Sequence, residues 1–122
     1  MNIKLSKYYN KRQAEEYEAR RNKPIWRAET DFFKLLIKEI SVKFSGKLGF
    51  LDVPVGTGRW IPLIQNIATK YVGVDVSTFM INQAQQKLKE CSNEFNKSSR
   101  FINTSIEKLP SCLNEKFEVI IM

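Results

Sequence analysis

A chain of 122 residues, 43% hydrophobic and 27% charged with a net charge of +7, has the size and composition of one globular domain. It contains no histidine, and its two cysteines lack metal-ligand spacing, so zinc sites of the usual kind and Ser–His or Cys–His nucleophile pairs are excluded and we expect no metal. No apolar run approaches the roughly 20 residues that span a bilayer, and no secretory leader is visible. The expected location is the cytoplasm, with no membrane partner.

Positive charge is concentrated near the N-terminus. Residues 1–47 hold twelve Lys and Arg against six Asp and Glu, so six of the seven net positive charges lie there. A basic arm can bind nucleic acid, although mixed charge of this kind is more often the solvated face of helices. Nucleic acid is therefore the less favoured partner.

Residues 1–47 are expected to form an N-terminal helical cap. Residues 10–21 are rich in helix formers, and Pro24 ends that run. A second, amphipathic helix is predicted over residues 25–44, because apolar side chains recur there at helical spacing. Its expected buried face consists of Trp26, Phe33, Leu36, Ile37 and Ile40.

Residues 48–122 alternate between apolar runs and helical patterns. Strands are predicted at residues 49–54, 71–75, 100–103 and 117–121. Helices are predicted at residues 59–69 and 77–91, a loop at 92–99, and a loop or short helix at 104–114. Because parallel strands are joined by right-handed crossovers, the expected fold is α/β, a Rossmann-like parallel sheet in order 3-2-1-4 flanked by helices.

The predicted fourth strand ends with the chain. An apolar strand with nothing beyond it leaves an open edge, which natural proteins avoid. We therefore expect an incomplete sheet, truncated after strand four, which a further segment, a second copy in a homodimer or another subunit completes.

A glycine turn between two acidic residues is the most informative motif. Asp52 closes the first predicted strand, and Asp75 closes the second. Gly56 and Gly58 lie between them, and because they lack Cβ the backbone there can adopt positive φ and approach a ligand closely. A carboxylate at the tip of the second strand can accept both hydroxyls of a ribose. The arrangement predicts a nucleotide-recognising βαβ unit.

Features absent from this loop restrict the nucleotide. A dinucleotide fingerprint requires a third glycine where this chain has Ile61, and the phosphate-binding G-x-x-x-x-G-K-[ST] pattern is also missing. A ligand with a ribose and no pyrophosphate fits better. S-adenosylmethionine is such a ligand.

The motif LDVPVGTGR at residues 51–59, followed by GVDVS at 73–77 and by Met80, resembles the class I S-adenosylmethionine-dependent methyltransferases over roughly residues 50–122. The resemblance implies that the glycine loop cradles the methionine end of the cofactor, that Asp52 holds its amino group and that Asp75 binds its ribose. Pro54 stands where the family usually has its first glycine, and Ser105 where it often has an acid facing the adenine. The implied cofactor-binding residues are Asp52, Pro54, Gly56, Thr57, Gly58, Asp75, Val76, Met80, Ser105 and Ile106.

The resemblance implies methyl transfer from S-adenosylmethionine to a small-molecule acceptor, with residues 48–122 supplying the cofactor-binding half of the enzyme. Two alternatives stay open: a non-catalytic methyltransferase-like binding module, and a nucleic-acid methyltransferase that uses the basic N-terminal arm. Because the cofactor is already activated by its positive charge, positioning carries much of the catalysis, and we assign no catalytic residue. By the same resemblance the N-terminal cap covers the cofactor, where Tyr17 and Trp26 either approach the site or pack the cap onto the sheet, the second being favoured.

Overall fold

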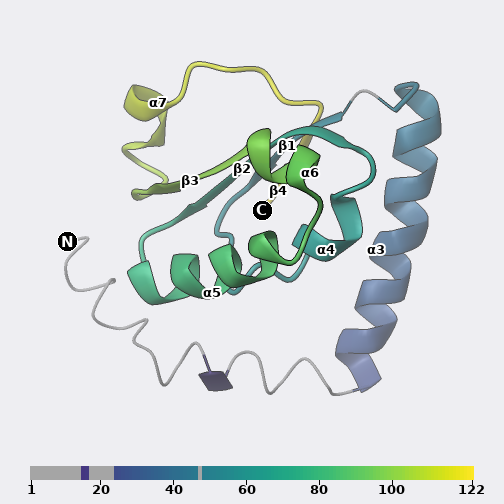
Figure 1. Ribbon diagram of the computed structural model, residues 1–122, viewed down its shortest axis with the longest axis horizontal. Helices are drawn as coiled ribbons and strands as arrows, with labels where there is room; N and C mark the ends of the chain where they lie inside the picture. The colour runs from purple at the N-terminus through teal and green to yellow at the C-terminus, as the bar shows by residue number, and fades with distance from the viewer. Residues whose placement is uncertain (1–14, 17–23, 47) are drawn as a thin grey trace.

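A computed structural model describes residues 15–16, 24–46 and 48–122 of the chain. Its centre is a four-stranded parallel sheet in the order β3-β2-β1-β4 (Figure 1), which confirms the predicted order 3-2-1-4. The strands are β1 (Leu48–Asp52), β2 (Ala68–Asp75), β3 (Ser99–Asn103) and β4 (Val119–Ile121). Asp52 pairs with Gly73 of β2, and Asp75 pairs with Asn103 of β3, so both acids lie at the carboxyl end of the sheet.

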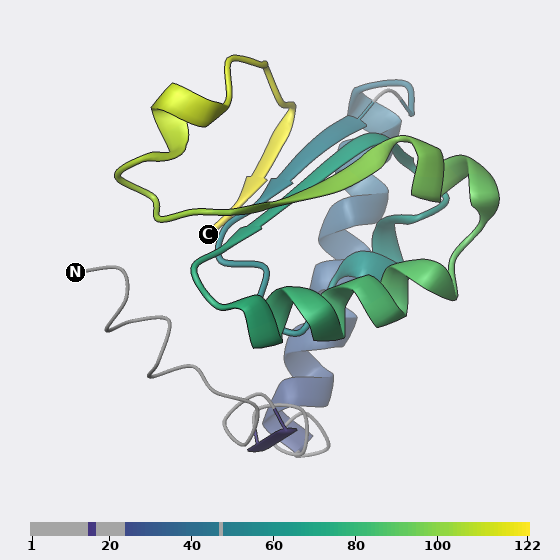
Figure 2. The ribbon, with the colours of Figure 1, turned by 60° about the vertical axis from the view of Figure 1, so that its left-hand side comes forward.

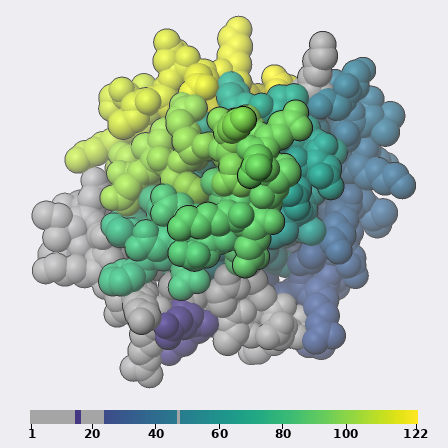
Figure 3. All heavy atoms as spheres, in the orientation of Figure 1, coloured from purple at the N-terminus to yellow at the C-terminus, as the bar shows by residue number. Residues whose placement is uncertain are grey.

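Helices cover the two faces of the sheet unequally. Alternate strand residues point to opposite faces, so Phe50 and Tyr71 belong to one buried cluster and Leu51 and Val72 to the other. The first cluster lies under α3 (Pro24–Lys43), α4 (Ile61–Ile64), α5 (Thr78–Lys89) and α6 (Asn93–Lys97). Of the helices that the structure describes, only α7 (Leu109–Cys112) packs on the second, and Figure 2 shows it on the far side of the sheet from α5. In the space-filling view, α5 and α6 (green) form much of the front, and α3 (blue) forms its right-hand margin (Figure 3).

The helix predicted over residues 25–44 is present as α3, but its buried face is narrower than expected. Ile37 is buried, and Phe33 and Ile40 are partly buried against the core, whereas Leu36 is 41% exposed, so its place in the buried face was wrong. Successive residues are about 100° apart around a helix, and α3 contacts the rest of the fold along a single stripe. The other expected helix, over residues 10–21, lies outside the described residues except for 15–16.

The helix predicted over residues 59–69 was too long. Only Ile61–Ile64 are helical, as α4, and β2 already begins at Ala68. Pro62 is tolerated near the start of α4 because its missing N–H has no helical partner there. Further on, Ala68 pairs with Leu48, and the Thr69 hydroxyl donates to the Leu48 carbonyl at 3.1 Å. Strand pairing therefore takes residues that the sequence pattern had assigned to the helix.

The loop predicted over residues 92–99 was also wrong, because Asn93–Lys97 form helix α6. Ser92 caps this helix, accepting a hydrogen bond from the Phe95 N–H at 3.2 Å. Phe95 is 2% exposed and anchors the helix in the core, where its ring lies 5.9 Å from that of Tyr71. Within the described ranges, no helix is both long enough and apolar enough to cross a membrane.

Candidate functional site

The segment between β1 and α4 turns sharply at two glycines, and we call residues 53–58 the glycine loop. Gly56 has φ 58° and Gly58 has φ 83°, in the left-handed region that favours glycine. Gly58 also packs tightly, since a Cβ at this position would lie 2.9 Å from the Ala84 Cα of α5. The Val55 N–H donates to the Val74 carbonyl at 2.8 Å, which holds the glycine loop against β2.

Asp75 connects the glycine loop to the end of β2. Its Oδ2 accepts a hydrogen bond from the Gly56 N–H and its Oδ1 one from the Ser77 N–H, both at 2.9 Å. The residue is 5% exposed, and burial raises the pKa of the Asp75 carboxyl, while backbone N–H groups of Ser77, Gly56 and Val76 act in the opposite direction. The carboxylate is thus fixed in orientation, and its two oxygens, with about four lone pairs between them, keep acceptor capacity for a further donor.

Asp52 lies deeper than Asp75. It is 1% exposed, and its Oδ2 accepts a hydrogen bond from the Tyr71 hydroxyl at 2.9 Å. Burial, and then the Asp52 charge, raise the pKa of Tyr71 well above its usual value, so the hydroxyl stays a donor at neutral pH. Tyr71 therefore fixes the Asp52 carboxylate from the core side of the sheet.

A cavity of about 380 Å³ opens at the carboxyl ends of the strands, beside the glycine loop. Its volume falls within the roughly 300–1,000 Å³ typical of small-molecule sites. Its walls are mainly apolar, and its acidic groups are the carboxylates of Asp75 and Glu107. The residues that line it are Val53, Pro54, Gly56, Val74, Asp75, Val76, Met80, Thr104, Ser105, Ile106 and Glu107.

Seven of the ten residues named from the sequence line this cavity: Pro54, Gly56, Asp75, Val76, Met80, Ser105 and Ile106. The other three do not. Asp52 and Thr57 are buried behind the lining, and Gly58 packs against α5, so their ligand contacts stay predictions. Among the described residues Trp26 is also absent from the lining, and Tyr17 lies outside the described residues.

Four lining residues, Val53, Val74, Thr104 and Glu107, were not among the ten expected cofactor-binding residues. Each is adjacent in the chain to a named residue, at or beyond the end of β1, β2 or β3. In a parallel sheet the carboxyl ends of the strands meet at one edge. The position of these four residues near the strand ends would therefore have been enough to predict that they line the cavity.

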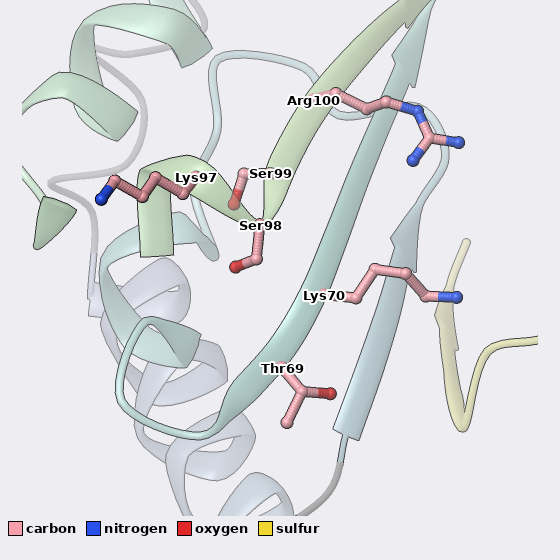
Figure 4. A pocket seen from close by; sticks show the side chains of 6 residues that line it. All are labelled: Thr69, Lys70, Lys97, Ser98, Ser99 and Arg100. Carbon is pink, nitrogen blue, oxygen red and sulfur yellow. The ribbon is translucent and has the colours of Figure 1, made fainter. Parts of the chain in front are cut away.

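A second cavity, of about 330 Å³, lies at the opposite, amino end of the sheet. It is lined by Thr69, Lys70, Lys97, Ser98, Ser99 and Arg100. Figure 4 shows the Lys97 side chain directed away from those of Lys70 and Arg100. Lys70 and Arg100 both form ion pairs with Glu115. Two of the three cations of this cavity are therefore already paired with Glu115 and the third points elsewhere (Figure 4), which argues against an anion site.

The parallel order 3-2-1-4, the glycine loop after β1 and the acid at the end of β2 are features of the Rossmann-like nucleotide-binding fold, to which the S-adenosylmethionine-dependent methyltransferases of class I belong. The sequence model of a family described as "Methyltransferase domain" matches residues 50–122, and the chain belongs to this family.

The chain is also similar to individual proteins. An uncharacterized protein of Haemophilus influenzae is 31% identical over 121 residues, which are 98% of this chain and 46% of that protein. Magnesium protoporphyrin IX methyltransferase of Synechocystis PCC 6803, solved with bound SAM, superimposes on 98% of this chain with a TM-score of 0.72 at 19% identity. An rRNA methylase of Streptococcus thermophilus matches 62% of the chain with a TM-score of 0.52 at 17% identity.

At these identities the similarity to the two solved enzymes is one of fold. The chain covers 59% of the Synechocystis enzyme and 44% of the Streptococcus enzyme. It thus spans about half the length of the relatives that it matches.

Proposed function

We propose that this chain binds S-adenosylmethionine in the cavity beside the glycine loop and supplies the cofactor-binding half of an enzyme that methylates a small molecule. The main support for the proposal is the Asp75 carboxylate. It is largely buried, is oriented by two backbone N–H groups and faces an otherwise mainly apolar cavity. A ribose needs such an acceptor, and an adenine needs apolar walls on its faces.

The residues present fit this cofactor. Asp75 has acceptor capacity left for ribose hydroxyls, and the missing side chain of Gly56 leaves room for close approach of the ligand. Val76, Met80 and Ile106 supply apolar surface of the kind that an adenine ring contacts. The bound cofactor would contribute a methyl group already activated by the positive charge on sulfur. The chain's own contribution is to bind, orient and shield the ligand from water.

A small molecule is the favoured acceptor. The Synechocystis magnesium protoporphyrin IX methyltransferase matches almost the whole chain, whereas the rRNA methylase matches less of it with a lower TM-score. The net charge of +7 keeps a nucleic-acid acceptor as the second candidate. Binding to RNA that weakens steeply as salt rises, together with methylation of that RNA, would favour this second candidate.

A partner segment that completes the sheet is also part of the proposal. A groove of about 650 Å³ runs along the α7 side of the sheet, and it shares Val53 and Ile106 with the cofactor cavity. Ile120 of β4 lines this groove and is 57% exposed. Further polypeptide, from a longer form of the protein, a second copy or another subunit, would cover this apolar surface. The same proposal divides the chain into a cap at residues 1–47 and a binding domain at 48–122. It also includes a cytoplasmic location, with which the two free cysteines are consistent.

Calorimetric titration of the chain with S-adenosylhomocysteine, the product of the proposed reaction, tests the binding step. Binding in the micromolar range is expected. Transfer of labelled methyl from S-adenosylmethionine to a panel of small molecules and to RNA then identifies the acceptor. Binding without transfer to any acceptor, even when the completing segment is supplied, would favour the non-catalytic module, and absence of binding by a folded chain would overturn the proposal.

A further inference from the structure

Arg59 directly follows the glycine loop, and its side chain is inserted between two tryptophans. Its guanidinium carbon lies 4.6 Å from the centroid of the Trp26 ring and 4.3 Å from that of the Trp60 ring. The Arg59 side chain is 8% exposed although it carries a full charge. Cation–π contacts of this kind gain strength when the charge is removed from water.

Every hydrogen bond described for the Arg59 side chain leads to helix α3. Nη1 donates to Glu29 Oε1 at 2.8 Å. Nη2 donates to the Trp26 carbonyl at 2.7 Å and to the Thr30 hydroxyl at 3.1 Å. A buried guanidinium requires several acceptors, and α3 supplies them from consecutive turns.

A second contact reinforces the attachment of α3. The ring of Phe33 stacks on the ring of Trp60, with centroids 3.9 Å apart and an angle of 20° between the planes. In Figure 1, α4 lies directly beside α3. The residues that follow the glycine loop are thus held by α3 through both a charged and an aromatic contact.

The glycine loop is therefore fixed at both ends. The Gly56 N–H donates to the Asp75 carboxylate, which lines the cavity, and Arg59 is held by α3. Only Thr57 and Gly58 separate these two points. Gly58 packs too closely on Ala84 of α5 to accept a Cβ. Because the connection is only two residues long, a displacement of Arg59 reaches the backbone at Gly56.

We propose that Arg59 is a positioning residue of the cofactor cavity, through which docking of helix α3 and binding of the cofactor are coupled. The inference rests on the proposed function, because it assumes that the cavity binds S-adenosylmethionine or its product. No α3 residue among those described lines the cavity, so α3 acts through Arg59 and not by touching the ligand. Coupling of this kind is reciprocal: α3 strengthens ligand binding, and the ligand strengthens the docking of α3.

Arg59→Lys is the informative substitution, because it keeps the charge and removes the planar, forked group. A lysine cannot stack between two indole rings or bond three acceptors in one plane. Glu29→Gln is the milder variant, and because Glu29 is 56% exposed it leaves the fold intact. Arg100→Lys is the matched control, since Arg100 pairs with Glu115 at the amino end of the sheet and its side chain is 48% exposed.

The experiment combines two measurements on the whole chain. Calorimetric titration with S-adenosylhomocysteine gives the affinity of each variant, and hydrogen exchange with and without this ligand reports the docking of α3 over residues 24–43. We expect Arg59→Lys to weaken binding about tenfold and Glu29→Gln to weaken it less, with Arg100→Lys unchanged. The ligand should slow exchange in α3 of the wild type and do so less in Arg59→Lys.

The outcomes separate the two claims. A wild-type chain that is folded and binds no S-adenosylhomocysteine overturns the proposed function, and the coupling falls with it. Wild-type binding, with unchanged affinity in both Arg59→Lys and Glu29→Gln, overturns the coupling alone. A variant that melts at lower temperature yet binds the ligand with wild-type affinity shows a purely structural role for Arg59, which also overturns the inference. If Arg59→Lys does not fold, the affinity of Glu29→Gln decides.

Discussion

Asp75→Asn tests the ligand-binding carboxylate with the smallest change in side-chain size. The change preserves the size of the side chain while it removes the negative charge and converts one acceptor oxygen into a donor. In the structure, the two oxygens accept the backbone N–H groups of Gly56 and Ser77, and the carboxylate keeps acceptor capacity for a ribose hydroxyl. A hydrogen bond to a charged group contributes about 1.5–3 kcal/mol, so binding of S-adenosylhomocysteine should weaken by about 10- to 150-fold.

Calorimetric titration measures this loss, and a matched variant separates it from a general effect on the fold. Glu118→Gln is that control, because Glu118 Oε1 accepts the Gly49 N–H at 2.6 Å, at the amino end of β1 and away from the cavity. In both variants a charged side-chain oxygen that accepts a backbone N–H is replaced by a neutral amide. Only Asp75→Asn should lose affinity for S-adenosylhomocysteine. A folded Asp75→Asn chain that binds as tightly as the wild type would refute the assignment of Asp75 to the ligand.

Three further outcomes are expected. Gly56→Val should abolish S-adenosylhomocysteine binding in titration, because φ 58° is strained for valine and its side chain would enter the cavity; normal binding would mean that the loop does not face the ligand. Tyr71→Phe should lower the free energy of unfolding by about 1.5–3 kcal/mol in urea denaturation, because the buried Asp52 carboxylate loses a hydroxyl donor, and an unchanged midpoint would contradict this. Binding should weaken as pH falls through the pKa of Asp75, since the ligand requires the charged carboxylate. Because burial raises that pKa, the loss of affinity should begin above the pH at which an exposed aspartate titrates. An identical pH profile of binding for Asp75→Asn would contradict this.

The central sheet was predictable from the sequence because the strands are short apolar runs at regular intervals. Right-handed crossovers, together with the nucleotide-recognising βαβ frame, favoured the order 3-2-1-4, and the structure has that order. The positive φ of Gly56 and Gly58 was likewise readable from the motif. These features depend on local sequence and on general rules of chain geometry.

The features that could not be predicted from the sequence depend on tertiary contacts. Pairing of Ala68 with Leu48 limits the length of α4. Helix α6 is stabilised by the capping side chain of Ser92 and by burial of Phe95. Neither leaves a periodic pattern in so few residues. Whether Asp52 lines the cavity or lies behind it depends on how the glycine loop turns. The contact between Arg59 and α3 joins residues about 30 positions apart, so no local pattern indicates it.

Titration of the isotopically labelled chain with S-adenosylhomocysteine, followed by amide chemical shifts in NMR, would show directly which residues the ligand contacts. We expect the largest changes at Gly56, at Asp75 and Val76, and at Ser105 and Ile106, which line the cavity beside the glycine loop. Saturable changes confined to the amino end of the sheet, or no changes in a folded chain, would contradict the assignment of this cavity to the cofactor.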